Sequence, residues 1–367
     1  MKKIRVAILG QGRSGRDIHA VNLKRMEDKY QIAAIVEPLE KRRERAKEEY
    51  GCALYADYTE LLGKSSEIDL VVNAAPSHFH VPVTLDLLCN GFNVLCEKPL
   101  AKTAAEVDRL MEAAAKNNRV LAVFQQSRFL EAYKKLKSVL DSGVLGRIVQ
   151  ISFRYNGFSR RWDWQTLQEY NAGSLYNTGP HPVDQILRLL DYDGMPEVRC
   201  YMDRVNTFGD AEDYVKLVMK APGKPVVDLE ISSCDPYTKF TYNVQAEHGG
   251  LQGDTSRLDY KYYVRETAPA QKLTREPIEK PDGTPAYCGE KLEWVEKTWK
   301  AGENDDQENS SSYVPGAPPD DPVKSFYLML YEHMVNGAPL EVTPGQVRQQ
   351  IAVMEECHRQ NPMSRLE

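Results

Sequence analysis

The 367-residue chain has neither a long apolar run nor a block of basic residues. No apolar run approaches the length of about 18 residues that a membrane-spanning helix needs. The formal net charge of −6, with Lys and Arg spread along the chain, argues against nucleic acid and anionic membrane surfaces as partners. The composition, 42% hydrophobic and 27% charged, is that of a globular protein.

Cysteine is also scarce, and no Cys-x-x-Cys pair is present. The seven cysteines are scattered and odd in number, so they are interpreted as reduced thiols rather than as disulfides or metal ligands. The N-terminal Met-Lys-Lys runs directly into an apolar segment, which leaves no room for a signal peptide. We therefore expect a cytoplasmic protein with no bound metal.

The length predicts two domains, each large enough to bury its own core. In residues 1–125, short apolar runs alternate with helical stretches, which predicts a doubly wound parallel sheet with right-handed crossovers. The strands of this first domain are expected at residues 4–9, 32–36, 68–75, 93–96 and 120–124.

Residues 126–367 are expected to form a second domain with an open, mostly antiparallel or mixed sheet, because long helices are missing between its apolar runs. Residues 266–320 are rich in Pro, Gly and charge and are interpreted as a surface excursion, partly a lid. Two helices, 323–336 and 344–360, close the chain. The strands of this domain are expected at residues 148–155, 198–205, 214–219, 226–231, 240–245 and 258–264.

A glycine-rich turn follows the first predicted strand and precedes a helix. In this context Gly-x-Gly-x-x-Gly indicates a dinucleotide site, because its glycines permit a tight turn, approach to a pyrophosphate and close packing of helix on strand. The helix N-terminus adds positive potential. The turn consists of Gly10, Gln11, Gly12, Arg13, Ser14 and Gly15.

The second predicted strand ends in Glu37, 22 positions after Gly15. A carboxylate there can accept hydrogen bonds from the adenosine ribose and would repel a 2′-phosphate, which favours NAD over NADP. Arg42 and its basic neighbours could offset that repulsion, so NADP stays the alternative. The competing interpretation is an exposed acid that merely begins a helix.

Lys98 ends a buried apolar strand, and Pro99 prevents that strand from continuing. Ligands bind at the carboxyl ends of strands in open α/β sheets, and an unpaired buried ammonium is costly, so Lys98 is a candidate functional residue. The alternative is a structural ion pair between Glu97 and Lys98. His78 and His80, after Ala75 and Pro76, could suggest a metal pair, but packing around a cofactor fits them better.

Pro180 and Pro182 place His181 in the first turn of a helix that runs to about residue 190. The positive end of the helix disfavours an imidazolium, so His181 should be neutral and able to take a proton. Asn177 and Asp184 lie on the same helical side. The alternative is a histidine packed under a loop.

The chain resembles the glucose–fructose oxidoreductase and inositol dehydrogenase family, in which an NAD(P) domain is joined to an open-sheet domain and the substrates are sugars and polyols. Four features carry the resemblance: the glycine turn, residues 76–80, residues 97–99 and residues 177–181. The resemblance implies that Lys98 lies beside the nicotinamide and the reacting hydroxyl, and that His181 is a general acid/base.

Asn177 departs from the family, which commonly has Asp there. An amide orients a hydroxyl but takes no proton, so Lys98 or His181 must supply the base, with Asp184 steadying the imidazole. Arg161 and Trp162 resemble the segment through which the second domain reaches cofactor and substrate. Trp162 and Trp164 could stack on a sugar, although core packing explains Trp164 equally well.

Motif and resemblance together give the expected site residues. The catalytic residues are Lys98, His181 and Asn177. The substrate-binding residues are Lys98, Arg161, Trp162, Asn177 and His181. The cofactor-binding residues are Gly10, Gln11, Gly12, Arg13, Ser14, Gly15, Glu37, Arg42, Ala75, Pro76, His78, His80, Glu97, Lys98, Gln126 and Trp162.

These features predict an NAD-dependent dehydrogenase acting on a secondary hydroxyl of a sugar, polyol or glycoside. One alternative is an enzyme that keeps NAD bound and cleaves a glycosidic bond through transient oxidation. Another is a non-catalytic sugar or NAD sensor. Because an open sheet face usually finds a partner, a homodimer or homotetramer is expected.

Overall fold

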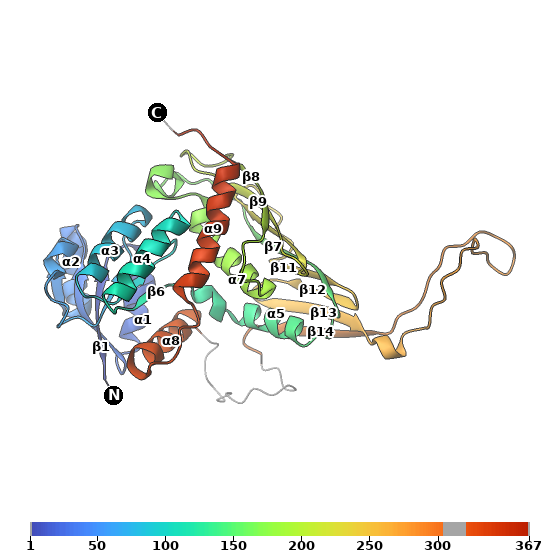
Figure 1. Ribbon diagram of the computed structural model, residues 1–367, viewed down its shortest axis with the longest axis horizontal. Coiled ribbons are helices and arrows are strands. Elements are labelled where there is room, and N and C mark those ends of the chain that lie inside the picture. The colour runs from blue at the N-terminus through green and yellow to red at the C-terminus, as the bar shows by residue number, and fades with distance from the viewer. Residues whose placement is uncertain (1, 304–320, 366–367) are drawn as a thin grey trace.

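The computed structural model describes residues 2–303 and 321–365. It contains a six-stranded sheet within residues 4–123 and an eight-stranded sheet within residues 148–300. In Figure 1 the first sheet and its helices lie at one end, and the second sheet extends away from them toward a long projecting loop. Within the described residues, no helix combines the length and the apolar character needed to cross a membrane.

The first sheet is parallel and has the order β3-β2-β1-β4-β5-β6, which confirms the predicted doubly wound architecture. Edge strand β3 was not foreseen. The strand predicted at 68–75 ends at Asn73, because the Asn73 side chain accepts a hydrogen bond from the Ala75 amide and so turns the chain. The strands are β1 (Ile4–Leu9), β2 (Tyr30–Val36), β3 (Ala53–Tyr55), β4 (Leu70–Asn73), β5 (Val94–Cys96) and β6 (Leu121–Val123).

The register brings the chemically distinctive residues to one edge of this sheet. Leu9 pairs with Val36 on one side and with Asn73 on the other, and Asn73 pairs with Cys96. Carboxyl ends of parallel strands therefore meet here, where such sheets bind ligands. The segments that follow these ends are the glycine turn, Glu37, residues 74–76 and the pair Glu97 and Lys98.

The helices of the first domain pack on this sheet. In α4 (Ala104–Lys116), the capping box of Thr103 and Glu106 fixes the first turn, and Val107 and Leu110 face the core. The helix after the glycine turn is wound as a π-helix over Arg13–Ala20 and continues as α1 (Val21–Lys24). The others are α2 (Glu40–Tyr50), α3 (His80–Cys89) and α4 (Ala104–Lys116).

The second sheet has the order β14-β13-β12-β11-β7-β10-β9-β8. Its described pairings are antiparallel except for β7 with β10, which confirms the predicted mixed, mostly antiparallel sheet. Its strands are β7 (Ile148–Asn156), β8 (Glu197–Asp203), β9 (Tyr214–Lys220), β10 (Val226–Ser232), β11 (Tyr242–Ala246), β12 (Gly249–Gly253), β13 (Arg257–Tyr263) and β14 (Trp294–Lys300).

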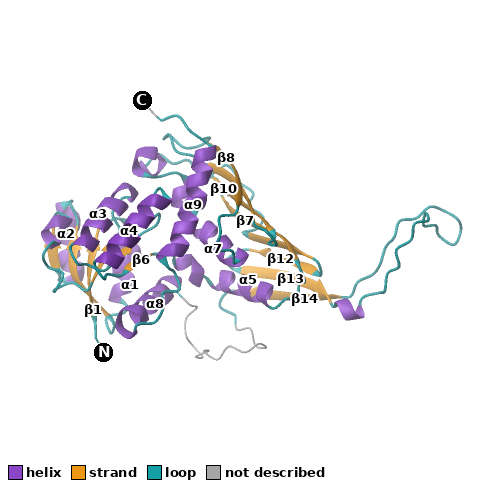
Figure 2. Cartoon of the chain, viewed as in Figure 1, coloured by secondary structure: helices purple, strands orange, loops and turns teal. Residues whose placement is uncertain are grey.

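Helices cover one face of this sheet, as Figure 2 shows. Helix α5 (Glu131–Asp141) lies against β13, α7 (Pro180–Leu190) against β10, and α9 (Pro344–Gln360) against β8. The opposite face carries a polar cluster in which Asp228 accepts hydrogen bonds from Arg154 and Lys216. The predicted open face is therefore a charged one.

The segment predicted as an excursion contains a strand that was not predicted. Residues 294–300 form β14 at the sheet edge, and the preceding residues project away from the molecule (Figure 1). Residues 304–320 lie outside the described part. None of the described residues between 266 and 303 lines the cavity at the carboxyl edge of the first sheet, and the lid stays a prediction.

Helix α8 (Pro322–Asn336) returns to the first domain. There the Tyr30 hydroxyl donates to the backbone oxygen of Tyr327, and the Tyr331 hydroxyl donates to that of Lys2. The last helix, α9, contacts both α4 and α7. The C-terminal helices therefore connect the two sheets.

Candidate active site

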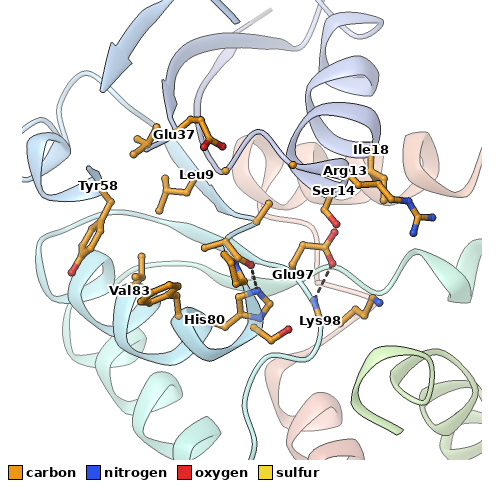
Figure 3. Close-up of a pocket in the computed structure, with 18 of the residues that line it drawn as sticks. Leu9, Arg13, Ser14, Ile18, Glu37, Tyr58, His80, Val83, Glu97 and Lys98 are labelled. Carbon is orange, nitrogen blue, oxygen red and sulfur yellow. Dashed lines mark hydrogen bonds between the residues drawn. The ribbon is translucent and has the colours of Figure 1, made fainter. Parts of the chain in front are cut away.

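A cavity of about 710 Å³ lies at the carboxyl edge of the first sheet and is closed by the second domain. Glu37 lies toward one end of it, and Glu97 and Lys98 lie toward the other (Figure 3). Fourteen of the predicted residues line this cavity: Gly10, Gly12, Arg13, Ser14, Glu37, Arg42, Ala75, Pro76, His80, Glu97, Lys98, Gln126, Asn177 and His181.

The glycine turn fits a dinucleotide. Gly10 has a φ of +90°, and a Cβ there would lie 2.7 Å from the Ala74 oxygen, so a side chain is excluded. A Cβ on Gly15 would lie 1.9 Å from the Gly10 oxygen, which shows how closely helix and strand pack. Gly12 faces open space, its nearest neighbour being an Arg42 nitrogen 4.0 Å from a Cβ. A pyrophosphate can therefore approach this backbone.

Glu37 is buried and fixed by backbone amides. Its Oε2 accepts from the Gln11 amide at 2.7 Å, and its Oε1 accepts from the Leu39 amide at 3.0 Å. Arg42 Nη1 lies 3.6 Å from Oε2. The interpretation as an exposed acid is thus wrong, and the carboxylate retains acceptor capacity for ribose hydroxyls. Arg42 stands where it could offset the repulsion of a 2′-phosphate.

Lys98 reaches across the domain boundary. Its Nζ donates to the backbone oxygen of Asn177 at 2.7 Å. Burial lowers the pKa of Lys98, the charge of Glu97 opposes that change, and Arg13 and Arg161 reinforce it. The amine can therefore exchange a proton closer to neutrality than an exposed lysine can.

Glu97 does not form the simple ion pair that was the alternative for Lys98. Its Oε2 accepts from the Lys98 backbone amide at 3.1 Å, and its Oε1 lies 3.0 Å from Nε2 of His19. Among the described residues, no ion pair joins the Lys98 amine to Glu97. His19 was not anticipated, because a histidine four positions after the last glycine of the turn carries no local signal for such a contact.

His181 occupies the first turn of α7, as predicted. Burial, reinforced by the charge of Lys98, lowers its pKa to about 3. Its Nδ1 is buried without a hydrogen-bond partner among the described residues. The imidazole is therefore neutral at physiological pH, but it is a weak base, so the geometry favours Lys98 as the proton acceptor and His181 as a hydrogen-bonding group.

Asn177 is held by the loop that precedes it. Its Oδ1 accepts from Gln165 Nε2 at 3.1 Å, and the Gln165 Oε1 accepts from Arg161. Arg161, predicted to bind substrate, does not line this cavity and instead donates a hydrogen bond to Gln165. Gln165 and Trp164 do line it, as does Tyr58, which sequence reasoning did not identify.

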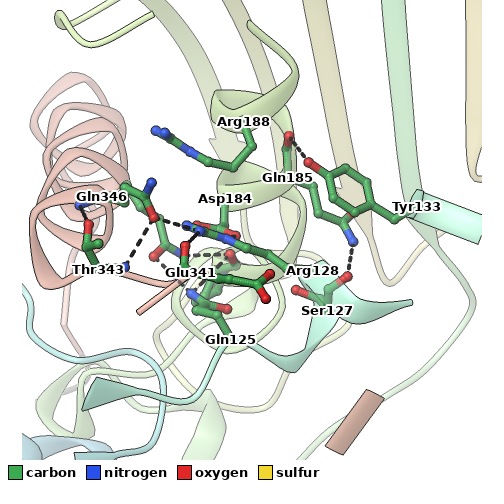
Figure 4. Close-up of polar contacts among 12 residues, drawn as sticks. Gln125, Ser127, Arg128, Tyr133, Asp184, Gln185, Arg188, Glu341, Thr343 and Gln346 are labelled. Carbon is green, nitrogen blue, oxygen red and sulfur yellow. Dashed lines mark hydrogen bonds and ion pairs between the residues drawn. The ribbon is translucent and has the colours of Figure 1, made fainter. Parts of the chain in front are cut away.

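The predicted role of Asp184 is wrong. Both of its oxygens accept from Arg128 at 2.6 Å, and Arg128 also donates to the Glu341 backbone oxygen and to Gln346 (Figure 4). Asp184 therefore joins α7 to the C-terminal segment instead of steadying His181. Its position on the helix gave no indication of a partner 56 residues away.

Four other predicted cofactor residues do not line the cavity. The Trp162 side chain is 78% exposed and packs near Phe208. Gln11 contributes its backbone amide to Glu37, and Gly15 packs under the turn. His78 lies against Tyr170.

The two nitrogens of His80 lie 2.6 and 2.9 Å from the backbone oxygens of Pro99 and Ala75. Both of its nitrogens are thus engaged with backbone atoms. Among the described residues, no group of three or more His, Cys, Asp or Glu side chains is arranged to hold a metal ion.

Comparison with known proteins identifies relatives of both domains. Residues 4–125 match the model of an oxidoreductase family with an NAD-binding Rossmann fold, and residues 133–252 match the C-terminal domain model of the GFO/IDH/MocA family. The first domain is therefore an NAD-binding Rossmann domain. An oxidoreductase structure from Thermotoga maritima superimposes with a TM-score of 0.77 over 99% of this chain and 98% of that one, at 18% identity, and so shares the fold.

Two curated relatives are dehydrogenases of inositols. The NADP-dependent scyllo-inositol 2-dehydrogenase of Bacillus subtilis is 31% identical over 196 residues, which is 53% of each chain. The inositol 2-dehydrogenase of Salmonella typhimurium is 28% identical over 204 residues, or 55% of this chain and 58% of that protein. These matches span little more than half of each relative. With both domain models matched in order, the chain belongs to the GFO/IDH/MocA oxidoreductase family.

Proposed function

We propose that this protein is an NAD(P)-dependent oxidoreductase that transfers a hydride between the nicotinamide and a secondary hydroxyl of a sugar, polyol or glycoside. The observation that carries the proposal is the position of the Lys98 amine, at the end of a Rossmann strand and within a cavity completed by Asn177 and His181. When bound, the dinucleotide supplies the hydride acceptor.

Lys98 takes the hydroxyl proton during oxidation and returns it during reduction. Its amine is held by the Asn177 carbonyl, and burial favours its neutral form. His181 remains neutral and orients the hydroxyl by hydrogen bonding. Glu37, at the far end of the cavity, binds the adenosine ribose and makes NAD the preferred cofactor.

The substrate class draws support from the two relatives that are named for inositols. A cyclic polyol and a pyranose present the same feature, a secondary alcohol flanked by further hydroxyls. The polar lining of the cavity at Gln126, Gln165 and Asn177 suits such neighbouring hydroxyls.

The test is a panel of sugars, inositols and glycosides screened for formation of reduced nicotinamide with NAD and with NADP. With an active substrate, Lys98→Met should lower kcat by at least about 10³-fold while NAD still binds. Lys102→Met, which alters a lysine four positions on that does not line the cavity, is the matched control and should keep normal kcat. Near-normal turnover by Lys98→Met would refute the assignment of Lys98.

The same preparations distinguish the two alternative functions. Protein that purifies with NAD attached and cleaves glycosides without added cofactor would indicate transient oxidation. Protein that binds sugar and NAD but reduces no cofactor with any substrate would indicate a sensor.

We also propose that the charged open face of the second sheet mediates a homodimer or homotetramer. Light scattering coupled to size-exclusion chromatography measures the mass directly. A monomer at micromolar concentration would contradict this assembly.

A further inference from the structure

A buried line of polar side chains runs from Lys98 to the C-terminal helix α8. Glu97 Oε1 lies 3.0 Å from His19 Nε2, and His19 Nδ1 lies 2.7 Å from the Tyr327 hydroxyl. His19 and Tyr327 are completely buried, and Glu97 nearly so. Residues far apart in the sequence thus meet directly behind the candidate catalytic amine.

The chemistry of Glu97 fixes the direction of its hydrogen bond with His19. A carboxylate only accepts, so His19 Nε2 carries the hydrogen that it shares with Glu97. The other ring nitrogen, Nδ1, is paired with the Tyr327 hydroxyl, a group that can both donate and accept. Burial raises the pKa of Tyr327 well above its usual value, so this hydroxyl keeps its proton. Both ring nitrogens of His19 therefore have a hydrogen-bond partner.

The line acts on the charge of Glu97. Burial alone would raise the pKa of Glu97, but the hydrogen bond and the charge of His19, followed by the charge of Lys98, outweigh it and lower the pKa to about 2. His80 is the other titratable group that acts on Glu97. Without the His19 donor, the buried carboxylate would lose its largest stabilising contact.

The charge of Glu97 in turn acts on Lys98. Among the charged groups around that amine, Glu97 favours the protonated form, whereas Arg13 and Arg161 disfavour it. His181, packed from the second domain, is neutral and adds no charge. Glu97 is therefore the anion that offsets the burial of Lys98.

We propose that His19 and Tyr327 are positioning residues, which hold the Glu97 carboxylate ionised and fixed behind Lys98 and thereby set the proton affinity of the reacting amine. This inference rests on the proposed function only in assuming that Lys98 exchanges a proton with the substrate. The proton affinity of the Lys98 amine itself can be measured without turnover. Packing is a separate role of His19, whose ring lies 4.6 Å from that of Phe124.

Four variants separate the two roles. His19→Leu fills the space but removes the donor to Glu97, and His19→Gln keeps a donor and an acceptor. Tyr327→Phe removes only the hydroxyl that is paired with His19 Nδ1. Tyr30→Phe is the matched control, because it deletes an equally buried hydroxyl that bonds the backbone oxygen of Tyr327 and lies outside the line.

The readout is the labelling rate of the Lys98 amine by a small acylating reagent, followed by peptide mass spectrometry from about pH 6 to pH 10. Only the neutral amine reacts. We expect His19→Leu to raise the Lys98 labelling rate at neutral pH about three- to tenfold, and Tyr327→Phe to raise it less. His19→Gln and Tyr30→Phe should match the wild type. With an active substrate, the rising limb of kcat against pH should move to lower pH in the same variants.

A His19→Leu protein that loses activity but labels like the wild type would overturn the proposal, because packing alone would then explain the loss. If His19→Leu does not fold, the comparison of Lys98 labelling rates in Tyr327→Phe and Tyr30→Phe decides. Equal labelling rates in these two variants overturn the proposal. A wild type that oxidises no sugar would refute the proposed function while leaving the labelling comparison intact.

Discussion

The side-chain amine of Lys98 donates a hydrogen bond to the backbone carbonyl oxygen of Asn177 across 2.7 Å, and this contact joins the segment after strand β5 to the short helix α6 (Ser174–Asn177) of the second domain. A backbone acceptor cannot be removed by exchanging side chains, so the amine keeps its anchor in variants of Asn177. The charge beside Lys98 can therefore be changed without releasing it.

Asn177→Asp should shift the pH dependence of oxidation upward. The new carboxylate can still accept from Gln165, and it places an anion in the cavity that holds Lys98, which favours the protonated amine. On the rising limb of the profile, oxidation should slow about three- to tenfold, while reduction, which uses the protonated amine, should change less. An unchanged profile in both directions would show that residue 177 does not act on Lys98.

Arg128→Met should destabilise the fold without altering the cavity. The substitution leaves the buried Asp184 carboxylate without its ion-pair partner. Removing one partner of a buried pair lowers the free energy of unfolding by about 3–5 kcal/mol. Urea unfolding measures the loss. Arg348→Met, which breaks an exposed pair with Asp108, is the control and should leave the midpoint nearly unchanged. Equal midpoints for the two variants would contradict a structural role for Arg128.

Glu37→Ala should weaken NAD binding and reduce the discrimination against NADP. The substitution removes the acceptor for the ribose and for the Gln11 amide, and it frees Arg42 from the carboxylate. Loss of a charged hydrogen bond of about 1.5–3 kcal/mol corresponds to roughly a 10- to 100-fold higher Kd for NADH. Calorimetry with NADH and NADPH tests this, with the exposed Glu40→Ala as control. An unchanged ratio of the two affinities would refute the role of Glu37.

Acid should destabilise the protein partly through His358. Burial lowers the pKa of this histidine to about 4 in the folded state, against about 6.5 for an exposed histidine, and its ring stacks on Tyr176. Between these values the unfolded chain binds a proton that the folded chain does not, so stability is lost as pH falls below about 6.5, by up to roughly 1.4 kcal/mol per pH unit. His358→Phe keeps the stacking and should lose less stability between pH 7 and pH 5 in thermal melts. Parallel losses in both proteins would contradict this.

The sequence allowed prediction of the site where the signals were local. The glycine turn, Glu37, Lys98 and His181 each follow a recognisable strand end or begin a helix, and parallel register then brings them to one cavity. Contacts between distant segments left no such trace. The partner of Asp184 and the line through His19 depend on where α7 and α8 pack, which periodicity does not reveal.

Physical features of strands β12 and β14 explain why they were not predicted from the sequence. Strand β12 contains three glycines in five residues, which lowers its apparent strand preference although both of its neighbours pair with it. Strand β14 is exposed at all of its residues but Val295 and Trp299, lies within a polar region and pairs with β13. Trp162 was predicted to line the site because an aromatic side chain can stack on a sugar. The cavity is lined instead by Trp164, two positions later in the sequence.

Helix α8 has a consequence for the growing polypeptide. The hydroxyl of Tyr30 and the imidazole of His19 find their partners on Tyr327, about 300 residues later in translation. While the Rossmann segment emerges from the ribosome, the Tyr30 hydroxyl and Nδ1 of His19 lack these partners, although Nε2 of His19 can already pair with Glu97. The nucleotide-binding half therefore completes its interior only after the last forty or so residues have been synthesised, although its own strands were made first.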